Sequence, residues 1–456
     1  MSGFLDYSIS EILAGYSTGR WAPEDIAQWC LSSYRALEPG VDAWETFSEG
    51  VLLKSIQESS NRLRAGIPLR PLEAIPVGVK DIFNTLDFPT QMGSPVWEGF
   101  NAGNDARAVF NLRRAGCVVP GKTVTAEFAV HSLGKTKNPH SEKLTPGTSS
   151  SGSAAAVAAG MVPVALGTQT AGSIVRPASF CGVWGCKPSF GLIPRTGMLK
   201  TTDSLDTVGF FVSHASDLET VFNALRVHGR NFPISNAALN DPTRQTPPHM
   251  RPWKIALVRP EVWSHVPDYA EHALAEWCRA LGNHSPARFE IVEARLPDGM
   301  ERSHVVHETI YNRSLAYYFQ EEYRRAELIS PIMETLIIAG QNIRTVDYEA
   351  ALEEQMQLAR KMDFFLQDYD ALVTLSTAGE APPREGHELP DTALMWTLTH
   401  LSVISAPVFR SPAGRPFGLQ LVTRRYSDPL LFSLVRELIS RGHLPARVFP
   451  ITRYVG

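Results

Sequence analysis

The chain has 456 residues, 44% hydrophobic and 20% charged, which is the composition of a globular protein able to bury a large core. Its net charge of −4 and scattered basic residues argue against electrostatic binding to nucleic acid or to an anionic membrane. No apolar stretch approaches the roughly 20 residues of a membrane span, and the start, MSGFLDYSIS, lacks the features of a secretion signal. Because the five cysteines are widely spread, as reduced thiols are, we expect a cytoplasmic protein.

The first third of the chain alternates helical and strand patterns. Residues 8–65 show helical hydrophobic spacing with polar breaks. The short apolar run AIPVGVK, residues 74–80, predicts a buried strand. Residues 106–124 predict a helix that stops at Gly116 and is followed by another strand. This alternation favours an α/β fold with a mainly parallel sheet.

The pattern continues through the middle of the chain. The alanine-rich run at 153–160 predicts a helix, and the serines before it are suited to capping its N-terminus. The run VPVALGT, residues 162–168, predicts a strand. Proline and asparagine are frequent at about 231–252, which indicates an excursion. Since the next run, WKIALVRPEV at 253–262, has a strand pattern again, we expect a single domain over 1–456.

Three residues with the chemistry for amide cleavage lie in these segments. Lys80 ends the run AIPVGVK, Ser149 lies in GTSSSGSAAAVAAG, and Ser173 follows 24 residues later in GTQTAGSIVRPAS. This order of lysine and two serines, in glycine- and serine-rich loops, resembles the amidase signature family. Members of that family cleave carbon–nitrogen amide bonds with a Ser–cis-Ser–Lys triad. The resemblance extends from Ser8 to the stretch LVTRRYSDPLLF at 421–432, which is most of the chain.

The resemblance implies both a fold and a triad. The implied fold is a central mixed β-sheet flanked by helices on both faces, with a signature core at about 74–210. Ser173 would be the nucleophile, Ser149 the proton bridge and Lys80 the general base. A cis peptide bond is implied between Thr148 and Ser149. No cofactor is needed for this chemistry.

An oxyanion hole is expected beside the nucleophile. Amide cleavage needs an activated nucleophile, stabilisation of the developing negative charge and a proton for the departing amine. Small residues in a tight turn let successive backbone N–H groups converge on one point. The hole would therefore be formed by the N–H groups of Thr170, Ala171, Gly172 and Ser173.

Lys80 must be neutral to act as a base, and burial can lower its pKa. The adjacent Asp81 would oppose this effect if both side chains faced the same way. Because neighbouring side chains of a strand point to opposite faces, the conflict is expected to disappear.

Metal binding is the competing interpretation of two other patterns. His304 and His307 could share one helical face, but no third ligand is evident, so a polar helix face or a pocket rim is favoured. Cys181 and Cys186 likewise have no further pair to complete a zinc site. We expect no metal.

The sequence departs from the family pattern at several positions. Thr148 replaces a glycine before the bridging serine, and Gln169 stands where aspartate is common. Arg176 lies one position later than the arginine of many members, so no role is assigned to it. His400 and Ser402 stand where the family often has Gly-x-Pro. Because they would add polar groups near the cleft, we predict that they bind substrate.

The function predicted from these residues is hydrolysis of a small-molecule, linear amide through a Ser173 acyl-enzyme. Two alternatives use the same triad: a glutaminase-type A subunit of a tRNA-dependent amidotransferase, which depends on partner proteins, and an acyl transferase. A catalytically idle scaffold is a third alternative. No binding to nucleic acid or to a membrane is expected, and a homodimer is left open. The sequence does not identify the substrate.

Overall fold

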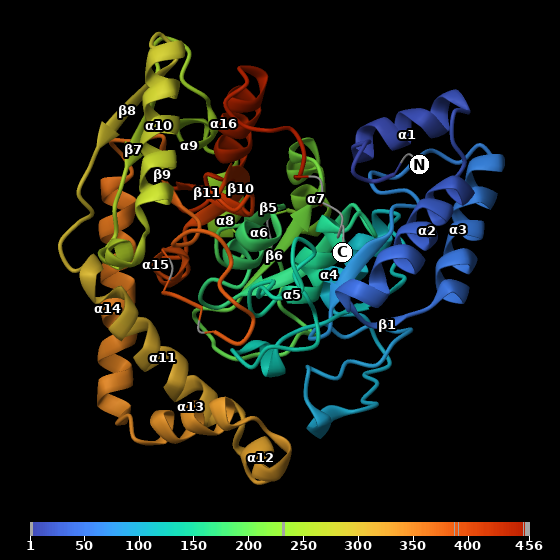
Figure 1. Ribbon diagram of the computed structural model, residues 1–456, viewed down its shortest axis with the longest axis horizontal. Helices are drawn as coiled ribbons and strands as arrows, with labels where there is room; N and C mark the ends of the chain where they lie inside the picture. The colour runs from blue at the N-terminus through green and yellow to red at the C-terminus, as the bar shows by residue number, and fades with distance from the viewer. Residues whose placement is uncertain (1–2, 230–232, 387, 391, 450, 452–456) are drawn as a thin grey trace.

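Every strand that the structure describes belongs to one sheet. The computed structural model describes residues 3–229, 233–386, 388–390, 392–449 and 451. The strands are β1 (Trp44–Phe47), β2 (Val77–Lys80), β3 (Gly121–Thr123), β4 (Val164–Gln169), β5 (Trp184–Lys187), β6 (Thr207–Val212), β7 (Trp253–Leu257), β8 (Phe289–Glu293), β9 (Ala371–Leu375), β10 (Ser402–Arg410) and β11 (Pro416–Thr423). Their order across the sheet is β1-β3-β2-β4-β6-β5-β10-β11-β9-β7-β8 (Figure 1).

The sheet is mixed, as the family resemblance implied. Strand β2 runs parallel to β3 and β4, and β7 runs parallel to β8 and β9, whereas the other neighbouring strands of the described sheet are antiparallel. The expectation of a mainly parallel sheet was therefore wrong. One cause is the tight turn over residues 411–415, which joins β10 to β11 as a hairpin. A turn this short can only connect antiparallel strands.

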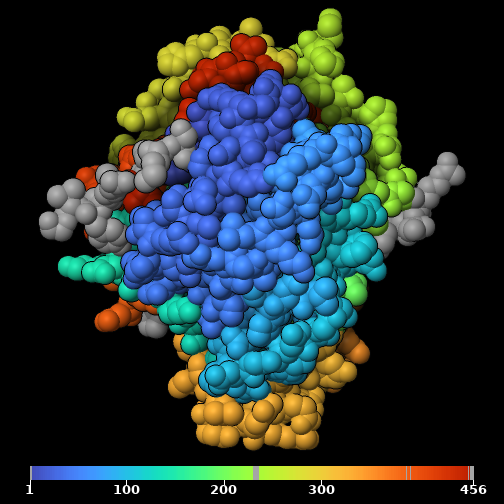
Figure 2. Space-filling view, turned by 90° about the vertical axis from the view of Figure 1, so that its right-hand side faces the viewer, coloured from blue at the N-terminus to red at the C-terminus, as the bar shows by residue number. Residues whose placement is uncertain are grey.

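Helices flank this sheet on both faces (Figure 1). They are α1 (Ile9–Thr18), α2 (Pro23–Val41), α3 (Glu49–Arg64), α4 (Arg107–Arg114), α5 (Ser151–Ala158), α6 (Val175–Cys181), α7 (Leu218–Leu225), α8 (Pro233–Leu239), α9 (Pro242–Gln245), α10 (Asp268–His284), α11 (Ser303–Tyr318), α12 (Gln320–Tyr323), α13 (Pro331–Gln341), α14 (Thr345–Phe365), α15 (Ala393–Leu398) and α16 (Asp428–Ser440). Helices α5 and α6 pack on the central strands, and α1–α3 cover the end near β1 (Figure 2).

Most elements expected from sequence periodicity are present. Strands β2, β3, β4 and β7 and helices α1 to α5 lie where the patterns predicted them. Strand β1 was missed, because its four residues, WETF, are too few to show a period. The predicted serine cap of α5 is wrong: its N-cap residue, Ser150, makes no side-chain capping bond and uses its hydroxyl elsewhere.

The proline- and asparagine-rich excursion contains two short helices, α8 and α9, although residues 231 and 232 lie outside the described residues. A hydrogen bond connects this excursion to the segment before α16: Arg244 Nη1 donates to the carbonyl of Arg425 at 3.0 Å. Strand β7 then enters the common sheet beside β9. No helix among the described residues is long and apolar enough to cross a bilayer.

Helices α11, α13 and α14 form a lobe beside the sheet, visible at the lower left of Figure 1 and at the lower end of Figure 2. A second hydrophobic cluster joins this lobe to the sheet, since it contains residues of α11, α13 and α14 together with Ala256, Leu372, Val403 and Val422 of the strands. Gly340 allows α13 to approach α11 closely, since a Cβ there would lie 1.9 Å from the carbonyl oxygen of Asn312. Ser330 caps α13 by accepting a bond from the N–H of Met333 at 3.2 Å.

Candidate active site

Lys80 is buried at the end of β2 among three hydroxyl groups. Its Nζ lies 2.8 Å from Ser149 Oγ, 2.9 Å from Thr168 Oγ1 and 3.1 Å from Ser150 Oγ. Burial lowers the pKa of Lys80 to about 7, although the carboxylate of Asp206 acts in the opposite direction. At neutral pH a substantial fraction of this amine is therefore unprotonated.

Asp81 points away from Lys80, as strand alternation predicted. Its Oδ1 lies 3.0 Å from the Nζ of Lys122, and its Oδ2 accepts a bond from the N–H of Gln91 at 3.0 Å. Burial raises the pKa of Asp81 to about 6, while Lys122 acts to lower it. The Asp81 carboxylate thus forms a separate buried ion pair with Lys122.

Ser149 lies in the loop that leads into α5. The peptide bond between Thr148 and Ser149 is cis, as the resemblance implied. The loop packs tightly against α6. A Cβ at Gly147, whose φ is +89°, would lie only 2.7 Å from the Cα of Pro177. Only glycine combines that backbone angle with so little space.

The hydroxyl of Ser150, the next residue, is hydrogen-bonded to Thr168 on β4. Its hydroxyl donates to the carbonyl of Thr168 at 3.1 Å and accepts from the N–H of Thr168 at 3.2 Å. Because its proton is already donated, Ser150 can only accept from Lys80.

Ser173 lies in the loop between β4 and α6, where the carbonyl groups are held by partners from distant segments. The carbonyl of Thr170 accepts from His307 Nε2 at 2.8 Å, and that of Ala171 accepts from Thr397 Oγ1 at 2.7 Å. The carbonyl of Gly172 accepts from the N–H of Arg176 at 2.8 Å. In a planar trans peptide the N–H points opposite to the C=O. The N–H groups of the next residues, including Ser173, therefore point away from these partners.

Gln169 organises the same loop. Its Oε1 accepts from the N–H groups of Ile174 at 2.8 Å and Val175 at 3.0 Å, and its Nε2 donates to Thr397 Oγ1 at 2.9 Å. An aspartate, common here in the family, has no donor for Thr397. The replacement by glutamine thus links the loop to α15.

His307 was expected on a polar helix face or pocket rim, and it lines the cavity described below, as does His304. Burial lowers the pKa of His307 to about 4, so the ring is neutral and its Nε2–H donates to the carbonyl of Thr170. Among the residues described, no group of three His, Cys, Asp or Glu side chains could hold a metal ion. The five cysteines are free and buried.

Glu388 is a site residue that sequence reasoning missed. Its Oε1 accepts from the N–H of Thr148 and from Thr145 Oγ1, both at 2.9 Å. Its Oε2 accepts from Thr148 Oγ1 at 2.6 Å and from Arg176 Nη1 at 2.7 Å. Burial would raise the pKa of Glu388, but Arg176 and these donors lower it below its ordinary value. Glu388 thus connects two departures from the family pattern, Thr148 and Arg176.

The structure does not bring the two predicted substrate-binding residues to this site. His400 stacks on Phe190 at 4.3 Å between ring centroids, and its Nε2 lies 2.7 Å from the carbonyl oxygen of Ser204. Ser402 is buried on β10, where its hydroxyl interacts with the carboxylate of Asp428. Neither side chain lines the cavity. The His400 ring is used inside the fold and Ser402 is buried on β10, so we do not retain the predicted role in substrate binding.

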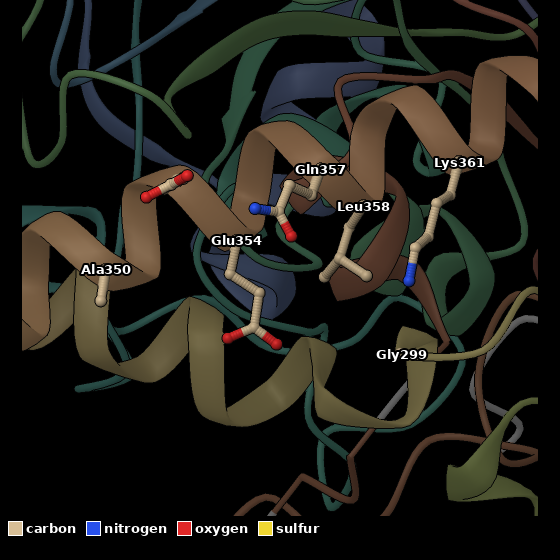
Figure 3. Close-up of a pocket in the computed structure, with 7 residues that line it drawn as sticks. Gly299, Ala350, Glu354, Gln357, Leu358 and Lys361 are labelled. Atoms are coloured by element: carbon tan, nitrogen blue, oxygen red, sulfur yellow. The ribbon is translucent and has the colours of Figure 1, made fainter.

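A cavity of about 600 Å³ is lined by residues next in sequence to the candidate triad, whereas Lys80, Ser149 and Ser173 are not among the described residues that line it. Its floor includes Thr148, Ala171 and Arg176, which are close in sequence to Ser149 and Ser173. Its lining also includes residues of helices α11 and α13 and residues 384–386 and 388–390. A second hollow, of about 250 Å³, lies along α14 beside Gly299 and shares no residue with the first (Figure 3). Two of its charged groups have partners: Glu354 pairs with Arg302, and Lys361 donates to the carbonyl of Asp298.

The structure thus combines a mixed sheet with a buried lysine whose Nζ lies beside the hydroxyl of Ser149. A family model described as Amidase matches residues 25–432, and the chain belongs to this family of amidase signature enzymes. Enzymes of this family act on carbon–nitrogen amide bonds.

Relatives with different activities resemble this chain over nearly its whole length. It is 28% identical to the A subunit of glutamyl-tRNA(Gln) amidotransferase from Cyanothece sp., covering 94% of this chain and 96% of that protein. Its fold matches that of the peptide amidase from Stenotrophomonas maltophilia with a TM-score of 0.82 and 25% identity, covering 99% of each chain. The fold also matches that of the corresponding amidotransferase A subunit from Thermotoga maritima, with a TM-score of 0.77, 24% identity and 99% of each chain covered.

Proposed function

We propose that this chain hydrolyses small linear amides, with Ser173 as nucleophile, Ser149 as proton bridge and Lys80 as general base, and that residues 1–456 act as one amidase domain. The observation that carries the proposal is the buried Lys80, whose pKa is about 7 and whose Nζ lies 2.8 Å from Ser149 Oγ. A base with a pKa near the working pH is best suited to accept and return a proton.

The hydrogen bonds around Lys80 favour this direction of proton transfer. A neutral amine has two N–H donors and one lone pair. One N–H is used by Ser150, which can only accept, and the second can be used by Thr168. The lone pair is then free to accept the hydroxyl proton of Ser149. Ser149 in turn can take the proton of Ser173, in a bond that stays a prediction.

The reaction follows in two balanced halves. Ser173 Oγ bonds to the amide carbon while its proton passes through Ser149 to Lys80. The proton then returns through Ser149 to the amide nitrogen, the carbon–nitrogen bond breaks, and the amine leaves. Water then attacks the acyl carbon while its proton passes through Ser149 to Lys80. The ester bond to Ser173 breaks, the proton returns through Ser149 to Ser173 Oγ, and the carboxylic acid is released. The oxyanion is stabilised by N–H groups of Thr170 to Ser173, whose orientation is supported by the bonds of the intervening carbonyls.

A glutaminase-type A subunit of an amidotransferase is the second candidate, because the Cyanothece relative is named for an amidotransferase and matches nearly the whole chain. Such a protein would depend on partner proteins. The purified chain alone should hydrolyse simple amides if the first proposal is right, and should remain inactive on them without partners if the second is right. An acyl transferase would instead transfer the acyl group to an added amine in competition with water.

The test of the triad is labelling with a fluorophosphonate probe followed by mass spectrometry of the modified peptide. The label is expected on Ser173 in the native chain and absent in Ser173→Ala. A parallel screen of amides against the native chain and Ser173→Ala then identifies products that depend on the nucleophile. Absence of labelling in the folded native chain would contradict the proposal and favour an idle scaffold.

A further inference from the structure

One wall of the cavity is apolar although it is open to solvent. Ile332 and Leu336 lie one helical turn apart on α13 and both line the cavity. Leu389 lines it from the opposite segment. Ile332 and Leu389 are 46% and 47% exposed. The opposite face of α13, with Met333 and Ile337 buried, packs in the lobe. Exposed apolar side chains that converge on one cavity commonly mark a ligand surface.

The charged groups of the cavity do not suit a negatively charged ligand. Among the described residues of its lining, the Arg and Lys side chains are Arg176 and Arg384. Arg176 is paired with Glu388, and the guanidinium of Arg384 donates to the carbonyls of Thr136 and of Gly134. The exposed rim instead includes two carboxylates, Glu308 and Glu385.

We propose that the wall formed by Ile332, Leu336 and Leu389 is a subsite for an alkyl or aryl group of an uncharged amide. The inference rests on the proposed function and specifies its substrate class. An amino acid amide such as glutamine carries an α-carboxylate, whereas the two arginines of the described lining, Arg176 and Arg384, already have partners. An apolar group, in contrast, would remove these three side chains from water when it binds.

The expected gain in kcat/KM follows from the apolar area of the substrate that the wall can cover. A methylene that is fully buried improves binding by about fourfold. The wall is open on one side, so four additional methylenes are expected to raise kcat/KM by at least about tenfold.

The experiment measures kcat/KM of the purified chain on two matched pairs of amides and on glutamine. Hexanamide against acetamide tests a group on the acyl side, and N-pentylacetamide against N-methylacetamide tests a group on the amine side; the members of each pair differ by four methylenes. At least one long member should exceed its short partner by about tenfold or more, and glutamine should be the poorest primary amide.

Variants of α13 test whether a preference for long amides depends on Ile332 and Leu336. The double variant Ile332→Ser/Leu336→Ser should reduce kcat/KM on the preferred long amide by at least about fivefold and leave its short partner within about twofold. Ile338→Ser is the matched control, because Ile338 is 41% exposed on the same helix but does not line the cavity. It should leave both substrates unchanged.

Three results would overturn the subsite. Long and short members of both pairs could be hydrolysed equally well, or glutamine could be the best substrate. Labelling of Ser173 without hydrolysis of any long amide would also overturn the subsite while the nucleophile assignment stands. If Ser173 is not labelled and no amide is hydrolysed, the proposed function itself fails.

Discussion

Replacing Glu388 by glutamine should destabilise the protein and slow turnover together. The carboxylate forms a nearly buried ion pair with Arg176, with side chains only 14% and 9% exposed, and it also accepts three bonds from Thr145 and Thr148. Glutamine keeps the size but places an NH₂ group where donors already converge. Breaking one side of a buried ion pair costs about 3–5 kcal/mol, so we expect the free energy of unfolding to fall by about 3 kcal/mol.

The loss of turnover follows from the position of Thr148. Glu388 binds both its N–H and its hydroxyl, and Thr148 directly precedes Ser149, the proposed proton bridge. A catalytic group displaced by about 1 Å can lose about 100-fold in rate. We therefore expect kcat of Glu388→Gln to fall between about 10- and 100-fold, with a smaller change in KM.

The assay combines urea unfolding with kinetics on one uncharged amide. Glu385→Gln is the control, since Glu385 is an exposed carboxylate three residues away in the same segment. Arg176→Met and the double variant Glu388→Gln/Arg176→Met complete a double-mutant cycle. The free energy of unfolding of the double variant should fall by at least about 1 kcal/mol less than the sum of the two single losses. Unchanged stability and kcat in Glu388→Gln, or strictly additive losses, would refute the reasoning.

The ion pair between Glu388 and Arg176 also makes the free energy of unfolding depend on pH. The pKa of Glu388 is lowered in the folded protein from an ordinary value of 4.5. Its contribution is therefore fully present above about 4.5 and is lost as the pH falls through the lower, folded value. Acid unfolding of Glu388→Gln should lack this component.

Four further predictions concern the candidate triad and its surroundings. Ser173→Ala and Lys80→Ala should each remove nearly all turnover, the pair no more than either alone, and Ser149→Ala should be milder because water can partly replace a hydroxyl. The logarithm of kcat/KM should rise with pH and level off above about 7 as Lys80 loses its proton, which a pH profile measures. Exhaustive chelation should leave activity unchanged; loss with recovery on added zinc would contradict this. His400→Ala should lower the melting temperature and leave the ranking of substrates unchanged, because the His400 ring contacts Phe190 and the carbonyl of Ser204.

Short-range patterns in the sequence predicted much of this fold. The strand ending at Lys80, the alanine-rich helix after Ser149 and the strand before Ser173 were all predicted within a few residues, since each depends on local hydrophobic spacing. Alternation along β2 also placed Asp81 away from Lys80 correctly.

Contacts between distant segments could not be predicted in this way. Glu388 lies 212 positions from Arg176, and His307 lies 137 positions from Thr170. Nothing in the local sequence of either residue distinguishes it from an ordinary surface carboxylate or helix histidine. The same limit explains His400, whose ring was expected near the cleft but contacts Phe190.

The amino-acid sequence by itself indicated the class of this protein, because Lys80, Ser149 and Ser173 lie in three short segments that resemble the amidase signature family. The tertiary structure decided everything that depends on two surfaces meeting: the direction of most strands, the pKa of Lys80, the partners of Thr148 and the apolar wall on α13. Burial and pairing are properties of side chains that pack together, and packing partners are chosen by the fold as a whole rather than by neighbours along the chain.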